Sequence, residues 1–343
     1  MASVERYLRK DHVPHIWCSG CGNGIALGAT LRAIDELAWD MDQVVMVSGI
    51  GCSSRATGYV DSCTLHTTHG RAIPFATGIK MARPDLKVVV TTGDGDAAAI
   101  GGNHLIHAAR RNMDLTVILY NNHIYGMTGG QCSPATPWGD WATTAPHGNV
   151  DHAFDISALV AAAGASFVAR QTVYHAAALQ KLIRQALEHS GFSMVEAMTP
   201  CPTAYGRKNK LKSPVAMMED LKERAVSITS IDPAHPPTMD DAILTGIIAD
   251  REKPEYAAEY LSLIERLRAG MSSQGSRRFS AAAATSSARA TISRRVLRST
   301  AGSLATGILV EVFVLAAMGV SRGSAGTPQS YPRQPRSAPG LPS

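Results

Sequence analysis

The chain has 343 residues, 45% of them hydrophobic, and a formal net charge of +5 at pH 7. This length is sufficient for one large domain, and the apolar content is that of an ordinary soluble protein. Nine of the 33 basic side chains but only one of the 28 acidic ones lie in residues 271–343, which leaves a net charge of −3 for residues 1–270. The positive charge therefore belongs to the tail, and no nucleic acid is expected as a partner of the folded part.

The N-terminal segment Met1–Lys10 is charged and has no apolar core. A secretory signal would need such a core, so we expect a cytoplasmic protein. The cytoplasm is reducing, and the six cysteines are therefore not expected to form disulfides.

Apolar runs alternate with helical segments along residues 22–198. Helices are predicted over Asn23–Trp39, Ala72–Arg83, Ala97–Arg111 and His175–His189, and strands over Val44–Val47, Leu86–Thr92, Leu115–Tyr120 and Phe192–Met198. This alternation predicts an α/β fold, a doubly wound parallel sheet with helices on both faces. The stretch Gly129–Asn149 lacks periodicity and is predicted to be a long loop at a subunit interface or over the active site.

Two of these strands end in polar residues. Thr92-Gly93-Asp94-Gly95-Asp96 ends the strand from Leu86, and Tyr120-Asn121-Asn122 ends the next one. Successive parallel strands place their carboxyl ends at one edge of the sheet, where ligands bind in open α/β folds. Asp94 and Asn122 would converge there as oxygen ligands for Mg2+ holding a diphosphate. The glycines let the backbone approach the phosphates.

Four of the six cysteines occupy positions that suggest a shared site. Cys18 and Cys21 form a Cys-x-x-Cys pair, for which zinc, a redox dithiol and an iron–sulfur cluster are all candidates. Cys52 and Cys201 each follow an apolar run, so strand ends at the same sheet edge could bring both to the Cys18–Cys21 loop. Cys63 and Cys132 are interpreted as ordinary thiols.

Six motifs together resemble one family. They are Trp17-Cys18-Ser19-Gly20-Cys21-Gly22, Gly49-Ile50-Gly51-Cys52-Ser53-Ser54-Arg55, His66-Thr67-Thr68-His69-Gly70-Arg71, the GDGD…NN pair, Ile124-Tyr125-Gly126-Met127-Thr128-Gly129-Gly130-Gln131, and Cys201-Pro202-Thr203-Ala204-Tyr205-Gly206-Arg207. Colinear over about Asp11–Leu267, they resemble the β subunit of the 2-oxoacid:ferredoxin oxidoreductases, most closely the 2-oxoglutarate type. The resemblance implies the thiamine diphosphate-binding fold.

The resemblance also implies roles for individual residues. Asp94, Asn122 and the backbone carbonyl of Ile124 would ligate Mg2+. The residues lining the thiamine diphosphate would be Ile50, Gly51, Cys52, Ser53, Gly95, Asp96, Gly126 and Met127. Catalytic roles would fall to His69 and Arg71 near the thiazolium and substrate, and to Arg55, which could clamp the distal carboxylate of 2-oxoglutarate. One [4Fe-4S] cluster would be held by Cys18, Cys21, Cys52 and Cys201.

The implied reaction is the oxidative decarboxylation of 2-oxoglutarate with coenzyme A to succinyl-CoA and CO2, with electrons passed through the cluster to ferredoxin. The partners implied are an α subunit that carries the pyrimidine-binding domain, ferredoxin, the 2-oxoacid and coenzyme A, and further small subunits are compatible. An alternative is the same chemistry on pyruvate or a branched-chain 2-oxoacid. An alternative of another class is a non-catalytic subunit with a membrane- or nucleic-acid-binding tail.

Three parts are predicted along the chain. Residues 11–202 would form the cofactor-binding domain, residues 203–270 a mostly helical extension, and residues 271–343 a basic, low-complexity, disordered tail. The tail contains the apolar run Leu304–Val320, which is short for a membrane span and has Glu311 at its centre.

Overall fold

The computed structural model describes residues 4–211, 213–231 and 242–283, with side chains up to residue 269. The chain divides into two units, Met1–Leu267 and Arg268–Ser343. The first unit contains every candidate site residue. The apolar run Leu304–Val320 lies outside the described residues. Within the described ranges, no helix combines the length and the hydrophobicity that crossing a bilayer requires.

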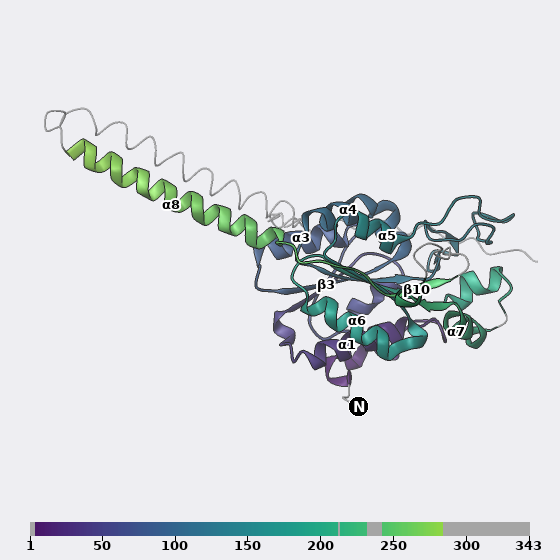
Figure 1. Cartoon of the computed structure of the whole chain (residues 1–343). Coiled ribbons are helices and arrows are strands. Elements are labelled where there is room, and N and C mark those ends of the chain that lie inside the picture. The colour runs from purple at the N-terminus through teal and green to yellow at the C-terminus, as the bar shows by residue number, and fades with distance from the viewer. Residues whose placement is uncertain (1–3, 212, 232–241, 284–343) are drawn as a thin grey trace, which may run out of the picture. The chain divides into compact units, whose positions relative to one another are not determined.

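The middle layer of the first unit is an eight-stranded sheet (Figure 1). Its strand order is β2-β1-β3-β4-β8-β7-β10-β9. The strands are β1 Val44–Ser48, β2 Cys63–His66, β3 Lys87–Gly93, β4 Thr116–Asn121, β7 Phe167–Thr172, β8 Ser193–Met198, β9 Ala225–Ser227 and β10 Ile243–Asp250. Neighbouring strands run parallel except β7 and β10, which are antiparallel. The predicted doubly wound parallel α/β sheet is confirmed.

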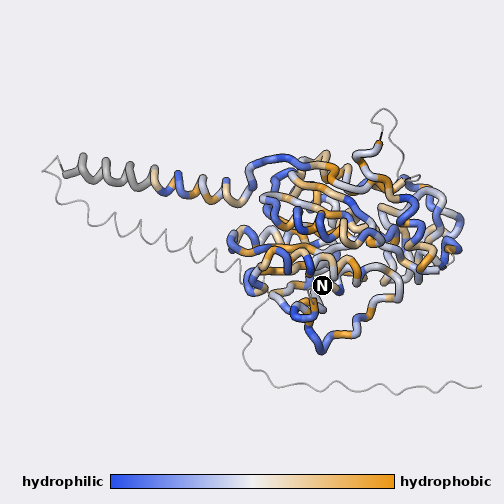
Figure 2. Tube along the Cα trace, turned by 60° about the horizontal axis from the view of Figure 1, so that its bottom comes forward, coloured by the Kyte–Doolittle hydropathy of each residue, from blue (hydrophilic) through white to orange (hydrophobic). Residues whose placement is uncertain are grey.

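Helices cover both faces of the sheet. In Figure 1, α1 (Asn23–Glu36) and α6 (Ala176–Glu188) lie on one face, and α3 (Ala72–Ala82), α4 (Gly102–Arg111) and α5 (Ile156–Ala162) lie on the other. Strand β4 contributes side chains to the hydrophobic cores on both faces of the sheet, because successive side chains of a strand point to opposite faces. Ile118 and Tyr120 join the core under α1 and α6, whereas Val117 and Leu119 join the core under α3 to α5. Hydrophobic and hydrophilic residues alternate along the covering helices (Figure 2).

Shorter elements connect these layers. They are α2 (Ala56–Tyr59), the two-stranded hairpin of β5 (Ile124–Tyr125) and β6 (Gln131–Cys132), and α7 (Pro214–Glu223). Two single π-helical turns, Asp96–Ile100 and Pro202–Gly206, follow the Gly-Asp-Gly motif and Cys201. The last helix is α8 (Tyr256–Ala283). A π turn places side chains differently from an α-helix, and such turns are frequent at functional sites.

The C-terminal extension differs from the mostly helical segment that its polar sequence predicts. It contains α7 and α8, but it also adds β9 and β10 to the sheet. The run Ile243-Leu244-Thr245-Gly246-Ile247-Ile248 is rich in β-branched residues, and β7 offers it an unpaired edge. Pairing with that edge satisfies backbone groups that would otherwise remain unpaired.

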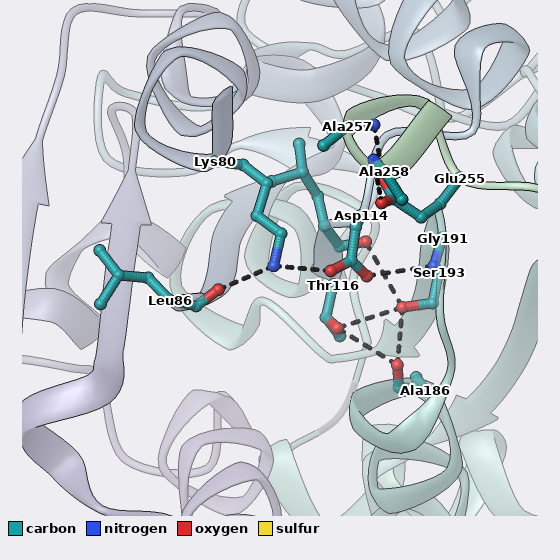
Figure 3. A network of polar contacts seen from close by, with 11 residues as sticks. Lys80, Leu86, Asp114, Thr116, Ala186, Gly191, Ser193, Glu255, Ala257 and Ala258 are labelled. Atoms are coloured by element: carbon teal, nitrogen blue, oxygen red, sulfur yellow. Dashed lines mark hydrogen bonds and ion pairs between the residues drawn. The ribbon is translucent and has the colours of Figure 1, made fainter. Parts of the chain in front are cut away.

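A polar network lies at the amino ends of the parallel strands, opposite the edge where ligands are expected (Figure 3). Lys80 of α3 is buried; its Nζ contacts Asp114 Oδ2 at 2.6 Å and donates to the Leu86 carbonyl at 2.8 Å. Asp114 Oδ1 accepts a hydrogen bond from Gly191 N at 3.1 Å. The buried charge of Lys80 is therefore paired, and the network ties α3 to the starts of β4 and β8.

Candidate active site

A cavity of about 100 Å³ opens at the carboxyl ends of β1, β3 and β4. Most of its lining comes from the loops that follow these three strands, as the motif positions predict, and one residue comes from the loop after β2. All the residues predicted to bind the diphosphate or Mg2+ line it: Ile50, Gly51, Cys52, Ser53, Asp94, Gly95, Asp96, Asn122, Ile124, Gly126 and Met127, and so does His69. The strand–loop pattern thus brings together residues that lie up to 77 positions apart.

Asp94 and Asn122 provide oxygen donors in this cavity. The carboxyl of Asp94 is buried and accepts a hydrogen bond from Ser133 Oγ. Burial raises the pKa of Asp94 to about 7, against the lowering effect of hydrogen bonds from Ser133 and from the backbone at Gly95 and Asn122. A buried carboxylate with raised pKa is stabilised by a cation, and carboxylate and amide oxygens suit Mg2+. The donor set therefore fits the metal.

Asp96 joins three loops around the cavity. Its Oδ1 accepts hydrogen bonds from the backbone N–H of Gly70 at 2.7 Å and of Ile50 at 3.3 Å, and lies 2.7 Å from His69 Nδ1. Its Oδ2 accepts from Thr92 Oγ1 at 2.8 Å. Both oxygens are thus used within the protein, so Asp96 orients His69 and the loop after β1. A carboxylate at Nδ1 favours the tautomer with a proton there, which leaves Nε2 as an acceptor.

Position 95 requires a glycine because the Tyr125 ring lies close to its backbone. A Cβ at this position would lie 2.2 Å from Tyr125 Cε1, and the Tyr125 hydroxyl donates to the Gly95 carbonyl at 3.0 Å. Any larger residue would displace the ring, which itself lines the cavity. The glycine in the motif therefore has a steric reason in addition to the access it gives to a phosphate.

The two predicted catalytic arginines lie outside the cavity lining. Arg55 is exposed and reaches Met127 Sδ at 4.0 Å, so it lies at the rim. Arg71 is exposed at the start of α3 and contacts His104 Nε2. Their roles toward a substrate stay predictions.

The four predicted cluster cysteines gather beside this cavity, and all are free thiols. Trp17 Nε1 donates to the Cys52 carbonyl at 2.7 Å, which ties the Cys18–Cys21 loop to Cys52. A Cβ at Gly22 would lie 3.2 Å from Pro200 Cδ, so the same loop also touches the residue before Cys201. A Cβ at Gly126 would lie 3.2 Å from Cys201 Sγ, which places this thiol against the cavity wall.

The thiols also influence one another electrostatically. Burial, together with negative charge on Cys201, Cys21 and Cys18, raises the pKa of Cys52 to about 11. Burial raises the pKa of Cys21 too, with added effects from Cys18 and Cys201. A free thiolate would therefore be disfavoured here, and a cationic centre would relieve the repulsion.

Among the described residues, no group of three or more His, Cys, Asp or Glu is spaced to hold a single metal ion. A [4Fe-4S] cluster places four irons and four sulfides between its thiolates, so its ligands stand farther apart than those of one ion. Four mutually coupled thiols from three loops fit such a group.

Sequence reasoning did not assign Tyr120 and Tyr125 to the site, although both line the cavity. Each lies within or next to a recognised motif. The signal that could have found Tyr120 is strand alternation, since it shares a face with Ile118 in the core against which Cys21 packs.

Comparison with known proteins gives consistent matches. Residues 49–197 match the family model of the thiamine pyrophosphate enzyme C-terminal TPP-binding domain; thiamine pyrophosphate is another name for thiamine diphosphate. The chain is 53% identical over 260 residues to the 2-oxoglutarate synthase subunit KorB of Methanothermobacter marburgensis, covering 76% of this chain and 91% of that protein. It is 50% identical over 268 residues to the KorB subunit of Methanocaldococcus jannaschii, covering 78% and 99%.

A solved structure is also similar. It is the 2-oxoglutarate:ferredoxin oxidoreductase from Magnetococcus marinus with 2-oxoglutarate, coenzyme A and succinyl-CoA bound, at a TM-score of 0.69 and 34% identity, covering 78% of this chain and 91% of that chain. The likeness thus extends over nearly the whole of each relative. The chain belongs to the 2-oxoacid:ferredoxin oxidoreductase β-subunit family, in its KorB branch.

Proposed function

We propose that this chain is the β subunit of a 2-oxoglutarate:ferredoxin oxidoreductase, which forms succinyl-CoA and CO2 from 2-oxoglutarate and coenzyme A. The observation that carries the proposal is the cavity in which all eleven residues predicted to bind the diphosphate or Mg2+ meet, with Cys52 in its lining and the Cys201 thiol against its wall. The names of the KorB relatives and the bound molecules of the Magnetococcus structure support the choice of 2-oxoglutarate.

The chain's own residues would first hold the cofactor. Asp94, Asn122 and the carbonyl of Ile124 would bind Mg2+, and the loop Ile50–Ser53 would present backbone N–H groups to the diphosphate. When bound, thiamine diphosphate supplies a nucleophilic carbon for the 2-oxo group and a sink for the electrons left by CO2 loss. His69, oriented by Asp96, would accept or return a proton at Nε2. Arg55 at the rim would bind the distal carboxylate.

The cysteines would hold the group that receives the electrons. Cys18, Cys21, Cys52 and Cys201 would hold one [4Fe-4S] cluster, and their position beside the cavity keeps the electron path short. Cys18 is exposed, so a ferredoxin could approach the cluster from that side.

An α subunit would complete the site. The cavity is bordered by apolar side chains that are half exposed, among them Ile50 and Met127 at 40% each. Exposed apolar residues around a ligand cavity are typical of a surface that a partner covers. The pyrimidine-binding domain of the α subunit is the occupant that the family implies.

The test is a reduction assay on the complex purified anaerobically with its α subunit, with a low-potential viologen as acceptor. We expect coenzyme A-dependent reduction with 2-oxoglutarate and little with pyruvate or 2-oxoisovalerate. Reduction with pyruvate or 2-oxoisovalerate instead would change the substrate and keep the mechanism. No reduction with any acid, in a complex shown to contain thiamine diphosphate and iron, would contradict the proposal.

A further inference from the structure

Tyr120 carries a buried hydroxyl without a hydrogen-bond partner among the described residues. The residue is 1% exposed and lies near the carboxyl end of β4. A buried tyrosine hydroxyl usually finds a partner, because leaving it unpaired costs stability. An orphaned donor beside a cofactor cavity therefore suggests a partner that the protein alone does not supply.

Two observations place Tyr120 beside the cavity and in the core that the cysteines contact. Tyr120 lines the cavity together with Cys52. It also belongs to the core under α1 and α6, against which Cys21 and Cys52 pack. Cys21 acts electrostatically on Tyr120, which agrees with a short separation between the two side chains. Toward a negatively charged neighbour, a phenol hydroxyl acts as a hydrogen-bond donor.

We infer that the Tyr120 hydroxyl donates a hydrogen bond to a sulfur on the Cys21 side of the [4Fe-4S] cluster and thereby raises the cluster's reduction potential. The inference rests on the proposed function, because it requires the cluster that Cys18, Cys21, Cys52 and Cys201 would hold. A one-electron reduction adds negative charge to the cluster. A donor to sulfur stabilises the reduced form more than the oxidised form, and hydrogen bonds to sulfur are one of the determinants of cluster potential.

The substitution Tyr120→Phe removes the hydroxyl and keeps the ring that fills the core. In the anaerobic complex with the α subunit, the potential is measured by a chemical redox titration followed by EPR of the reduced cluster. We expect the equilibrium constant for reduction to fall about tenfold, which is a shift of about 59 mV to lower potential for one electron. Iron and acid-labile sulfide are expected to stay at the wild-type level.

Tyr7→Phe is the matched control. Tyr7 belongs to the same core, and its hydroxyl donates to Asp35 Oδ1 at 2.6 Å, near the end of α1 remote from Cys21. Removing this hydroxyl should leave the potential unchanged. An equal shift in both variants would overturn the inference, because it would reflect a general loosening of the core.

Further outcomes separate this inference from the proposed function. A wild-type complex without iron would overturn both. If the wild-type complex contains a cluster and Tyr120→Phe leaves its potential unchanged, the inference alone is overturned. The same holds if Tyr120→Phe lowers the affinity for thiamine diphosphate but does not change the potential. If Tyr120→Phe does not retain its cluster, Tyr120→3,5-difluorotyrosine gives a stronger donor. The cluster potential of this difluorotyrosine variant should be higher than that of the wild type, and an equal or lower potential would overturn the inference.

Discussion

The side-chain amide of Asn121 donates a hydrogen bond to the fully buried Glu196 at 2.8 Å, and this contact fixes the turn that carries Asn122. Glu196 Oε2 accepts from Arg170 Nε at 2.7 Å and from Ser157 Oγ at 2.5 Å. Asn121 Oδ1 in turn accepts from the backbone N–H of His123 at 3.1 Å. The buried Arg170–Glu196 ion pair thus holds Asn121 in place and, through it, the neighbouring Asn122, which is the proposed metal ligand.

Glu196→Ala should strongly destabilise the protein. The change leaves the Arg170 guanidinium buried with one carboxylate fewer, and breaking a buried pair costs about 3–5 kcal/mol of unfolding free energy. Urea unfolding followed by tryptophan fluorescence measures the loss. Glu188→Ala is the matched control, because Glu188 pairs with Arg184 on the surface and both side chains are 45% exposed. Removal of such a pair should cost about 1 kcal/mol or less. Equal losses in the two variants would refute the account.

The stability that Glu196 supplies should depend on pH. Burial alone raises the pKa of Glu196, but Arg170 and the hydrogen bonds from Ser157 and Asn121 lower it further, so the net pKa is below the ordinary 4.5. A carboxylate with a lowered folded-state pKa stabilises the fold above its unfolded pKa and loses that contribution as pH falls through the folded pKa. The gap in unfolding free energy between wild type and Glu196→Gln should be constant from pH 8 to about 6 and shrink below about pH 4.5. A constant gap down to pH 3 would argue against this pair.

Gly95→Ala should weaken cofactor binding because its Cβ would collide with the Tyr125 ring at 2.2 Å. Displacement of a group by about 1 Å in such a site can lower activity about 100-fold. Thiamine diphosphate affinity, by titration calorimetry on the complex, is the measurement. Gly58→Ala in α2 is the control, since its Cβ would meet nothing within 4 Å. Wild-type affinity in Gly95→Ala would show that the ring can move without cost.

Cys201→Ser should remove the iron–sulfur cluster. Its thiol touches the cavity wall and raises the pKa of Cys52, so it belongs to the coupled set. Cys132→Ser should keep the cluster, because Cys132 lies in β6 and is absent from the groups that shift Cys52 or Cys21. Iron and acid-labile sulfide per complex distinguish the two. Full iron content in Cys201→Ser, or its loss in Cys132→Ser, would overturn the ligand assignment.

The part of the site that follows strand ends was predictable from sequence. Apolar runs ending in glycine and polar residues predict where parallel strands stop, and this alone places Asp94, Asn122 and the loop from Ile50 at one edge. Because each of these motifs follows a strand of the same sheet, residues that are distant along the chain meet at that edge. The alternation of strands and helices places the carboxyl ends of the parallel strands at one edge, and the resemblance to a family implied the role of each residue there.

Other features needed the three-dimensional structure. The role of Asp96 as a hub for His69, Gly70 and Ile50 depends on the π turn that begins at Asp96, and no local periodicity signals such a turn. Strand β10 has a β-branched run, but its place in the sheet depends on pairing with the distant edge of β7. The approach of the Cys18–Cys21 loop to Pro200 likewise arises from tertiary packing.

The most direct test of the central claim, that one cavity couples 2-oxoacid chemistry to the cysteine set, is EPR of the complex frozen after mixing with 2-oxoglutarate and coenzyme A in the absence of ferredoxin. We predict the signal of a reduced [4Fe-4S] cluster in the wild type and its absence in Asn122→Ala, whose cluster should still be reducible by dithionite. An unchanged spectrum in a wild-type complex that forms succinyl-CoA would contradict the account.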